Sequence, residues 1–352
     1  MTKKVRDSNI ELLRIICILG VIVLHYNGNV ALDMVVKGSI NDYLLLGLEI
    51  LFICAVNLFV LISGFFLCST NSRRAIKAIE LVVQVMLFGL GKYLLRVLLF
   101  SAPLTLGGFV SSAIPNNYYV TIYLALYLLS PYINLMLQKL SDKQFGVLLV
   151  LYLVLFSLIP TVLDTVNLTT GYNFNGLYPT GSGGSMYGYS FLNFSLMYLL
   201  GAYLRRKAPG KALWDWIGLA VCFGVLFVWQ LYCHPVARAY SNPLVIGIAV
   251  FAFRLMSRVK LRSAIINGLA KGAFTCFLLH DFFLHHIGID KVVNGNILVL
   301  LGHIVLSACG IFLVCWVAWL VYDKVTAPIF RLLGKRLGKL DHLLSPTTET
   351  QE

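Results

Sequence analysis

The chain has 352 residues, of which 59% are apolar or aromatic and only 12% are charged. A soluble globular domain carries about 25% charged residues, so this composition excludes an ordinary cytosolic enzyme, a disordered chain and a coiled coil. At roughly 20 residues per membrane-spanning helix, the apolar residues suffice for about ten spans. The sequence therefore predicts an all-α fold, a polytopic transmembrane helical bundle.

Apolar runs bounded by charged or turn residues mark ten expected spans along the chain. They cover residues 10–27, 43–69, 75–100, 118–138, 144–162, 189–204, 212–231, 243–258, 264–286 and 296–322. Residues 323–352 are then a short cytoplasmic tail. Because no internal repeat is visible, we expect a single membrane domain over 1–352.

The net charge of +13 suggests a nucleic-acid partner at first, but the positions of the basic residues indicate a membrane topology instead. Alternate loops carry 21 of the 28 lysines and arginines, in clusters at 3–6, 73–77, 139–143, 205–211, 254–262 and 324–339. The other loops carry only Lys37, Arg238 and Lys291. Since cytoplasmic loops are enriched in Lys and Arg, we expect both termini in the cytoplasm, contacts with membrane lipids and no nucleic-acid partner.

The opposite loops are nearly uncharged, and two of them are long, at 101–117 and 163–188. The second is rich in Gly, Asn, Ser, Thr and Tyr. Tyr and Asn side chains can stack on sugar rings and bond to their hydroxyls, so one interpretation is a glycan-facing loop. The other is a flexible loop with interfacial tyrosines.

Charged side chains within a span are costly and are functional candidates by default. The first span carries Glu11, Arg14 and His25. Arg14 and His25 are eleven residues apart, or about three helical turns and roughly 16 Å of rise, so both project from one face. Glu11 lies one turn before Arg14 and can pair with it. The alternatives are an Arg14 that snorkels to the interface and a His25 bonded to a neighbouring carbonyl.

His280 in the ninth span lies about 24 Å beyond Ala264, and His25 lies about 22 Å beyond Ile10, so both histidines can face one site. Glu49, on a span that begins at the other side, lies at a comparable depth. A histidine beside a carboxylate is the arrangement that a general base needs. The alternative is a structural polar cluster that joins helices.

Ser63 precedes the expected inner end of the second span, and Arg73 and Arg74 follow that end. Such Arg pairs bind phosphates well, although cytoplasmic charge and anionic lipid headgroups explain them too. Lys92 and Arg96, near the outer end of the third span, are expected to snorkel. The eight cysteines show neither a CxxC pair nor a Cys/His metal spacing, so no metal site is expected.

These residues resemble the acyltransferase-3 family of integral membrane acyltransferases. The stretch that ends at Arg14, followed by His25, is similar to its N-terminal motif, in which ten residues separate an Arg from a His. Residues 57–67 (NLFVLISGFFL) resemble its FF-x-x-SGF element, and the pair Arg73 and Arg74 resembles the basic motif that follows.

Two later segments extend the resemblance over nearly the whole chain. Residues 277–280 (FLLH) are similar to the family's YLxH motif, and residues 198–206 (YLLGAYLRR) resemble a segment common in Gram-positive members. Phe277 stands where Tyr is usual, and Asn57 stands where many members carry Asp or Pro. The resemblance implies a stand-alone, bacterial, multi-pass protein of the plasma membrane.

The family resemblance implies transfer of an acyl group, commonly acetyl, from cytoplasmic acyl-CoA (acetyl-CoA) to a hydroxyl of a cell-surface or lipid-linked glycan. In that reaction His25 is expected to be the general base, with Glu49 or His280 orienting it, and Arg14 to contact the donor. Arg73 and Arg74 are expected to contact CoA phosphates. The other residues expected to bind donor or acceptor are Glu11, Ser63 and Asn57.

Two other functions stay open. Polar residues inside a helical bundle also mark solute paths, so a transporter of a small polar solute such as an amino acid is the alternative. The two halves show no corresponding Gly/Pro-broken helices, which argues against an inverted-repeat carrier. A scaffolding subunit of a glycan-export complex would not need an Arg and a His on one face at two depths. The sequence indicates no oligomeric state.

Overall fold

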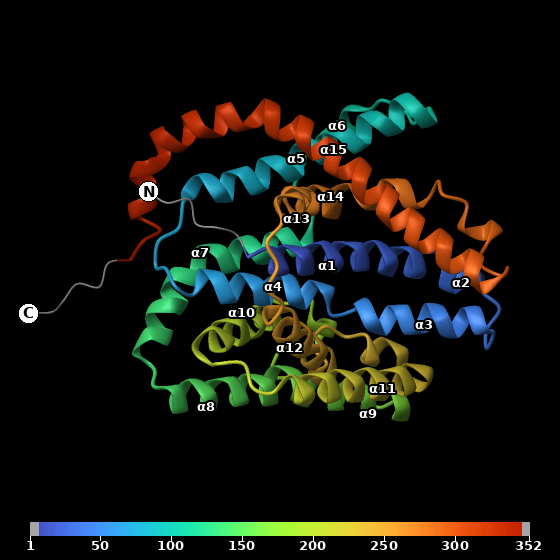
Figure 1. Ribbon diagram of the computed structural model, residues 1–352, viewed down its shortest axis with the longest axis horizontal. Coiled ribbons are helices and arrows are strands. Elements are labelled where there is room, and N and C mark those ends of the chain that lie inside the picture. The colour runs from blue at the N-terminus through green and yellow to red at the C-terminus, as the bar shows by residue number, and fades with distance from the viewer. Residues whose placement is uncertain (1–6, 347–352) are drawn as a thin grey trace, which may run out of the picture.

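The computed structural model describes residues 7–346, so the expected basic residues Lys3, Lys4 and Arg6 lie outside the described part. Across 7–346 the chain forms helices joined by loops, with no strand (Figure 1). The prediction of an all-α helical bundle is confirmed.

The α-helices follow the chain from one end of the described residues to the other. They are α1 (Ser8–Tyr26), α2 (Leu32–Met34), α3 (Ile40–Phe52), α4 (Ala55–Leu67), α5 (Ala75–Phe100), α6 (Leu106–Ala113), α7 (Tyr118–Lys139), α8 (Asp142–Leu153), α9 (Ile159–Thr170), α10 (Phe191–Arg206), α11 (Ala212–Ala237), α12 (Pro243–Ser257), α13 (Ala264–Leu269), α14 (Ala273–Leu284) and α15 (Ile297–Leu337). Two π-helical segments, η1 (Asn27–Ala31) and η2 (Val154–Leu158), continue α1 and α8. Short 3₁₀ turns are η3 (Asn175–Leu177), η4 (Met186–Gly188), η5 (Ala270–Gly272), η6 (Ile289–Lys291) and η7 (Gly338–His342).

Seven helical segments of the described chain are long and apolar enough to cross a membrane, compared with about ten expected spans. The expected spans 189–204, 243–258 and 264–286 correspond to the shorter α10, α12 and the α13–α14 pair. At 16 residues, α10 is about 24 Å long, which is less than a hydrocarbon core of about 30 Å. Most of α10 is buried, so protein rather than lipid surrounds it, and an interior helix need not match the bilayer.

Several helix ends differ from the expected ones. The expected span 43–69 is interrupted at Ile53 and Cys54, where α3 ends and α4 begins. The fifth expected span continues through η2 to Thr170, so the first part of the expected loop 163–188 is helical. The expected loop 101–117 contains α6, and α15 runs past residue 322 to Leu337.

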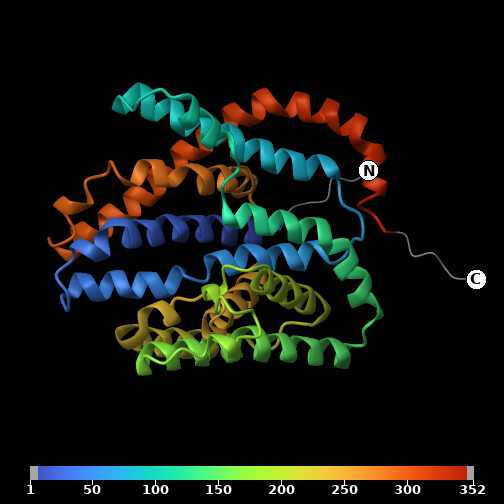
Figure 2. The ribbon, with the colours of Figure 1, turned by 180° about the vertical axis from the view of Figure 1, so that it is seen from behind.

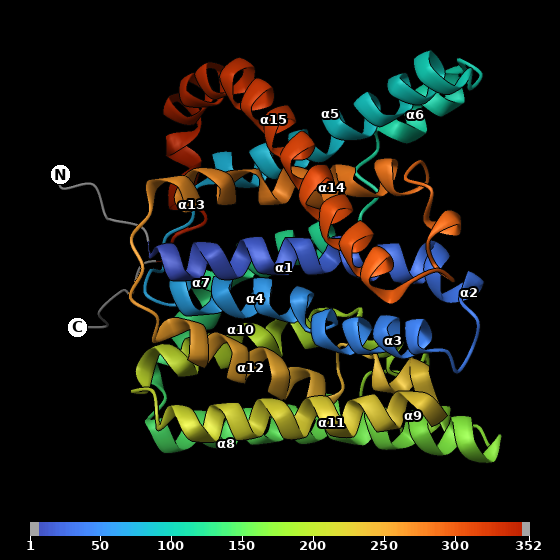
Figure 3. The same cartoon turned by 45° about the vertical axis from the view of Figure 1, so that its right-hand side comes forward.

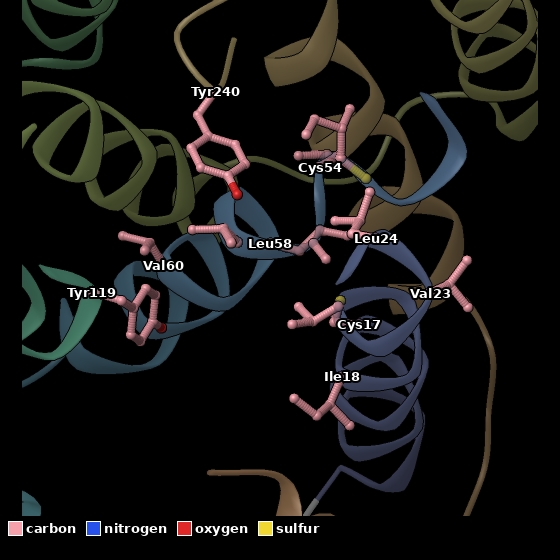
Figure 4. Close-up of a cluster of buried hydrophobic side chains, with 14 of the residues drawn as sticks. Cys17, Ile18, Val23, Leu24, Cys54, Leu58, Val60, Tyr119 and Tyr240 are labelled. Atoms are coloured by element: carbon pink, nitrogen blue, oxygen red, sulfur yellow. The ribbon is translucent and has the colours of Figure 1, made fainter. Parts of the chain in front are cut away.

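The first helix lies at the centre of the bundle (Figures 1 and 3) and packs against α3, α4, α12, α14 and α15. Most of its apolar residues are buried, including Ile18 and Ile22. In Figure 4, Leu24 of α1 lies beside Cys54, where α3 gives way to α4, and Leu58 continues the same buried cluster. Side chains on α1 are therefore held by several neighbouring helices.

The closest helix contact joins α4 and α10, and glycines make it possible. A Cβ at Gly64 would lie 2.2 Å from the carbonyl oxygen of Tyr198, and a Cβ at Gly201 would lie 2.1 Å from that of Leu61. Small residues let helix backbones approach in this way. The SGF element and the YLLGAYLRR segment are thus two sides of one contact.

One end of the bundle, where α1 begins, gathers the basic loops, and we call it the basic end. There Lys207 pairs with Asp142 at 2.6 Å, and Ser263 N donates to Ser8 Oγ at 3.0 Å. The last helix bends in its C-terminal part, where Pro328 removes a backbone donor, and η7 returns to this end (Figures 2 and 3). From η7, the Asp341 carboxylate accepts from Ala75 N at the start of α5, at 2.8 Å.

Candidate active site

The two predicted histidines are in contact. His280 Nε2 of α14 lies 3.2 Å from His25 Nδ1 of α1, and the rings meet edge to face at 4.7 Å between centroids. Each Nδ1 also approaches a carbonyl oxygen one turn earlier on its own helix, that of Val21 for His25 (2.9 Å) and that of Cys276 for His280 (3.0 Å). His280 is buried and His25 is partly exposed.

These contacts determine which nitrogens carry protons when both rings are neutral. The Cys276 carbonyl can only accept, so His280 Nδ1 carries a proton and His280 Nε2 is an acceptor. His25 Nδ1 faces that acceptor and the Val21 carbonyl, so it too carries its proton. The lone pair of His25 is therefore on Nε2. A proton taken up at Nε2 would be stabilised through Nδ1–H by two acceptors.

A cavity of about 410 Å³, which we call the His25 cavity, surrounds this pair. Helices α1, α3, α4, α5, α7 and α14 and the segments that contain Tyr189 and Tyr240 contribute to its wall. The lining residues are Val21, Leu24, His25, Gly28, Glu49, Ile53, Val56, Lys92, Asn117, Tyr118, Tyr189, Tyr240, Phe277, Leu278, His280 and Asp281. A polar ligand of monosaccharide size has room beside the imidazoles.

A second cavity of about 350 Å³, the Arg14 cavity, lies between the His25 cavity and the basic end. Besides Arg14 it is lined by two further cations, Lys77 at the start of α5 and Lys271 of η5, and by Ser63 and Glu80. The walls of the two cavities have three residues in common, Val21, Val56 and Phe277. The two cavities therefore adjoin along α1, with Arg14 at one level and His25 about 16 Å further on.

Arg14 and Glu11 form an ion pair with 2.7 Å between Nη1 and Oε1. Glu11 is buried, whereas the Arg14 side chain is about a third exposed and lines the Arg14 cavity. Ser63 Oγ donates to the Phe59 carbonyl at 2.9 Å and lies 3.2 Å from Tyr123 Oη. Both Arg14 and Ser63 therefore face the space on the basic side of the histidines.

Glu49 lines the His25 cavity but bonds to other groups than the histidines. Its Oε2 accepts from Asn27 Nδ2 at 3.2 Å, and its Oε1 lies 3.8 Å from Arg238 Nη1. The Asn27 amide also donates to the Leu45 carbonyl at 3.0 Å. Asn27 begins the π-helical turn η1, two residues after His25, so Glu49 holds the end of the helix that carries His25. Glu49 or His280 was expected to orient His25, and the side chain in contact with His25 is that of His280.

Asn57 and Arg73 are built into the fold. Asn57 is buried, donates to the Tyr240 carbonyl at 2.8 Å, and accepts from Asn193 Nδ2 at 3.0 Å. Arg73 is also buried, and each of its three guanidinium nitrogens donates to a protein oxygen, among them Ser130 Oγ at 2.8 Å and the Leu67 carbonyl at 2.9 Å. Neither side chain lines the two cavities.

Arg74, in contrast, lines a pocket of about 560 Å³ at the basic end. Arg331 and Lys335 of α15 stand on its other side, together with Pro328, Leu332 and Gly334. No carboxylate lines this pocket within residues 7–346. The bend of α15 thus places Arg331 and Lys335 beside Arg74, whose guanidinium, unlike that of Arg73, faces a pocket.

The sequence analysis missed three groups around the site. Lys92, expected to snorkel, lines the His25 cavity. Tyr118, Tyr189 and Tyr240 form an aromatic wall, with centroids 4.8 and 4.9 Å apart in succession. His303 of α15 lies 2.9 Å from the hydroxyl of Tyr26, the residue after His25. The depth of Lys92 along α5 was a usable signal. The tyrosines come from the start of α7 and from two loops, and no sequence pattern indicates that these segments meet.

Among residues 7–346 no group of three or more His, Cys, Asp or Glu side chains is placed to hold a metal ion. The His25 cavity holds the imidazole pair and the adjoining Arg14 cavity holds cations on the basic side. This layout suits moving a group between two substrates.

Comparison with known proteins agrees with this layout. The chain matches the model of the acyltransferase-3 family, described as an acyltransferase domain, over residues 7–323. No curated protein and no solved structure matches it. A family model that covers this much of the chain favours a membrane acyltransferase over a carrier or a scaffolding subunit. The chain belongs to the acyltransferase-3 family and is a membrane acyltransferase.

Proposed function

We propose that this protein moves an acyl group, acetyl in the simplest case, from cytoplasmic acyl-CoA to a hydroxyl of an extracytoplasmic or lipid-linked glycan. The observation that supports this most is the pair of adjoining cavities, with Arg14 in one and His25 in the other. The donor enters from the basic end through the Arg14 cavity. The acceptor occupies the His25 cavity from the opposite end.

In the transfer step His25 Nε2 takes the proton of the acceptor hydroxyl while the oxygen attacks the thioester carbonyl. The new C–O bond forms and the C–S bond breaks, so CoA leaves as a thiolate. The proton on His25 passes to this thiolate, either directly or through water, and the base is restored. His280 keeps its acceptor nitrogen toward His25 Nδ1–H, which holds the ring in the reactive tautomer and stabilises its protonated form.

The cations of the basic half suit an anionic thioester donor. Arg14, held by Glu11, contacts the donor within the membrane, and Ser63 lies in the same cavity. Arg74 binds CoA phosphates together with Arg331 and Lys335, since Arg73 has no donor left for a ligand. Arg73 instead holds the turn that presents Arg74. Asn57 likewise acts through the fold, by fixing α4 to the segment of Tyr240.

On the acceptor side, Tyr118, Tyr189 and Tyr240 offer faces on which a sugar ring can stack, and Asn117 offers an amide. Tyr189 follows the predicted glycan-facing loop directly. The basic end faces the cytoplasm by the positive-inside rule, in the plasma membrane of a bacterium. The enzyme needs no metal in this mechanism.

The test is the O-acyl content of cell-surface glycans from a deletion strain complemented with wild type, His25→Ala or His234→Ala. His234 is exposed and lines neither cavity, so it is the matched control. We expect wild type and His234→Ala to restore acylation and His25→Ala, at equal expression, to fail. Unchanged acyl content in all strains, with altered uptake or efflux of a small solute, would establish the carrier instead.

A further inference from the structure

A polar pocket of about 230 Å³ opens beside the His25 cavity, between α5, α6 and residues 114–117. We call it the Lys92 pocket. Its polar lining residues are Lys92, Tyr93, Arg96, Ser111, Ser112, Asn116 and Asn117. Lys92, Asn117 and Leu278 also line the His25 cavity, so the two spaces adjoin at Lys92.

Within residues 7–346 no carboxylate lines this pocket beside its two cations. Lys92 and Arg96 are four residues apart on one face of α5, and within the described residues neither forms an ion pair with a carboxylate. Asp281, in the wall of the His25 cavity, is the acid that acts electrostatically on Lys92. Two cations face one carboxylate here, which leaves net positive charge beside hydroxyl and amide groups.

The position of Lys92 along its helix argues against simple snorkelling. Lys92 is 17 residues beyond Ala75, and His25 is 17 residues beyond Ser8, so both lie about 26 Å from helix starts at the basic end. Lys92 is half-buried and lines two cavities. A cation within a span is retained where it faces a water-filled space or a partner, and Lys92 borders two such spaces.

We propose that the acceptor carries a phosphate group near the hydroxyl that is acylated, and that Lys92 and Arg96 bind this phosphate in the Lys92 pocket. The inference rests on the proposed function and specifies its acceptor. With the phosphate at Lys92, the sugar ring spans the His25 cavity and turns a hydroxyl toward His25 Nε2. Asn116, Asn117 and Ser112 supply neutral hydrogen-bond donors around the phosphate oxygens.

The test measures binding of glucose 1-phosphate, with glucose as the uncharged probe, to the purified full-length protein in nanodiscs of phosphatidylcholine alone. We expect wild type to bind the phosphate and to bind glucose at least tenfold more weakly. Lys92→Gln should lower the affinity for glucose 1-phosphate at least tenfold. Arg96→Gln should lower this affinity less, because Arg96 is exposed. The double variant should show no binding. Lys291→Gln, an exposed lysine outside this pocket, should bind like wild type.

Thermal unfolding without ligand checks that the variants fold, and Lys92→Arg should restore binding in part. Equal affinity of wild type and the double variant for glucose 1-phosphate would overturn the proposal. So would a response to phosphatidylglycerol in the nanodiscs with none to glucose 1-phosphate, since the two cations would then bind lipid headgroups. Binding of glucose 1-phosphate is measured without acyl-CoA, so its outcome and that of the acylation assay are separate results. Wild type that binds the phosphate but restores no glycan acylation would contradict the proposed function alone.

Discussion

His280 Nε2 lies 3.2 Å from His25 Nδ1, and each Nδ1 approaches the carbonyl oxygen of the residue four positions earlier. Because His280 reaches His25 from another helix, the tautomer of His25 depends on how α14 packs against α1. In the proposed mechanism a second imidazole takes the place of the carboxylate that usually partners a catalytic histidine. A neutral partner stabilises the imidazolium less than a carboxylate does, but it adds no buried charge.

The first prediction concerns this pair. His280→Ala should lower kcat by roughly 10- to 100-fold, which is less than the full contribution of a positioned base, about 100- to 10,000-fold, because His25 itself remains. The KM for acyl-CoA should stay unchanged. His280→Gln should recover part of the loss, because its amide oxygen can accept from His25 Nδ1–H. Initial rates with purified protein and labelled acetyl-CoA give kcat and KM for both variants. A Gln variant as slow as the Ala variant would show that His280 acts by packing alone.

The arginine pair should separate into a structural and a functional member. Arg73→Ala removes a buried guanidinium that bonds to groups on α4, its following turn and α7, so it should lower the apparent unfolding temperature. Arg74→Ala should leave that temperature within about 2 °C and should raise the KM for acyl-CoA several-fold. Lys139→Ala, an exposed lysine at the same end, is the control for general loss of positive charge. A donor KM raised equally by Lys139→Ala would contradict a specific role for Arg74.

The contact between α4 and α10 should tolerate no added methyl group. Gly64→Ala and Gly201→Ala each place a Cβ against a backbone carbonyl, and overpacking of this kind destabilises by about 1–3 kcal/mol or more. Gly224→Ala on α11 meets no atom within 4 Å, so it should be neutral or slightly stabilising. Size-exclusion chromatography after heating in detergent compares the three. Equal stability of Gly64→Ala and Gly224→Ala would show that the two helices can separate slightly without penalty.

The loop between α9 and α10 should loosen at high pH. Burial raises the pKa of the Tyr178 phenol above its ordinary value, and its bond to Asp164 Oδ1, at 2.6 Å, raises the pKa further. The stabilisation is therefore present below about pH 10, the ordinary pKa of tyrosine, and is lost as pH rises through the higher pKa of the folded state. Limited proteolysis between pH 8 and pH 11 should show increasing cleavage within 171–185. Tyr178→Phe should be cleaved more readily at pH 8 and should lose most of this pH dependence.

Helical periodicity predicted the parts of the site that lie on one helix. The spacing of Arg14 and His25 placed them on one face at two depths, and the structure puts them in adjoining cavities along α1. Counting residues from helix starts likewise placed His280 level with His25. What made these predictions possible is that a helix has a fixed rise and rotation per residue, which no neighbour can alter much.

The rest of the site depends on contacts between helices, which the sequence does not encode locally. The partners of Arg73 come from α4, its following turn and α7, so nothing near Arg73 in the sequence shows that its donors are taken. Glu49 lies at the expected depth, but Asn27 and Arg238 are nearer to it than the imidazoles. The π-helical turn η1 is a further case, since an inserted residue changes the helical register without a composition signal. The Lys92 pocket requires α6, in a segment that was expected to be a loop.

The meeting of the two cavities at Val21, Val56 and Phe277 also bears on the energy supply of the cell. A path open from one side of the membrane to the other would let protons leak and would dissipate the proton-motive force. The three residues that line both cavities are apolar, and hydrophobic constrictions exclude water in channels. A junction closed to water in this way would let an apolar acyl group pass between the cavities without letting protons through. Phe277 would then help to block proton leakage, besides packing against His280.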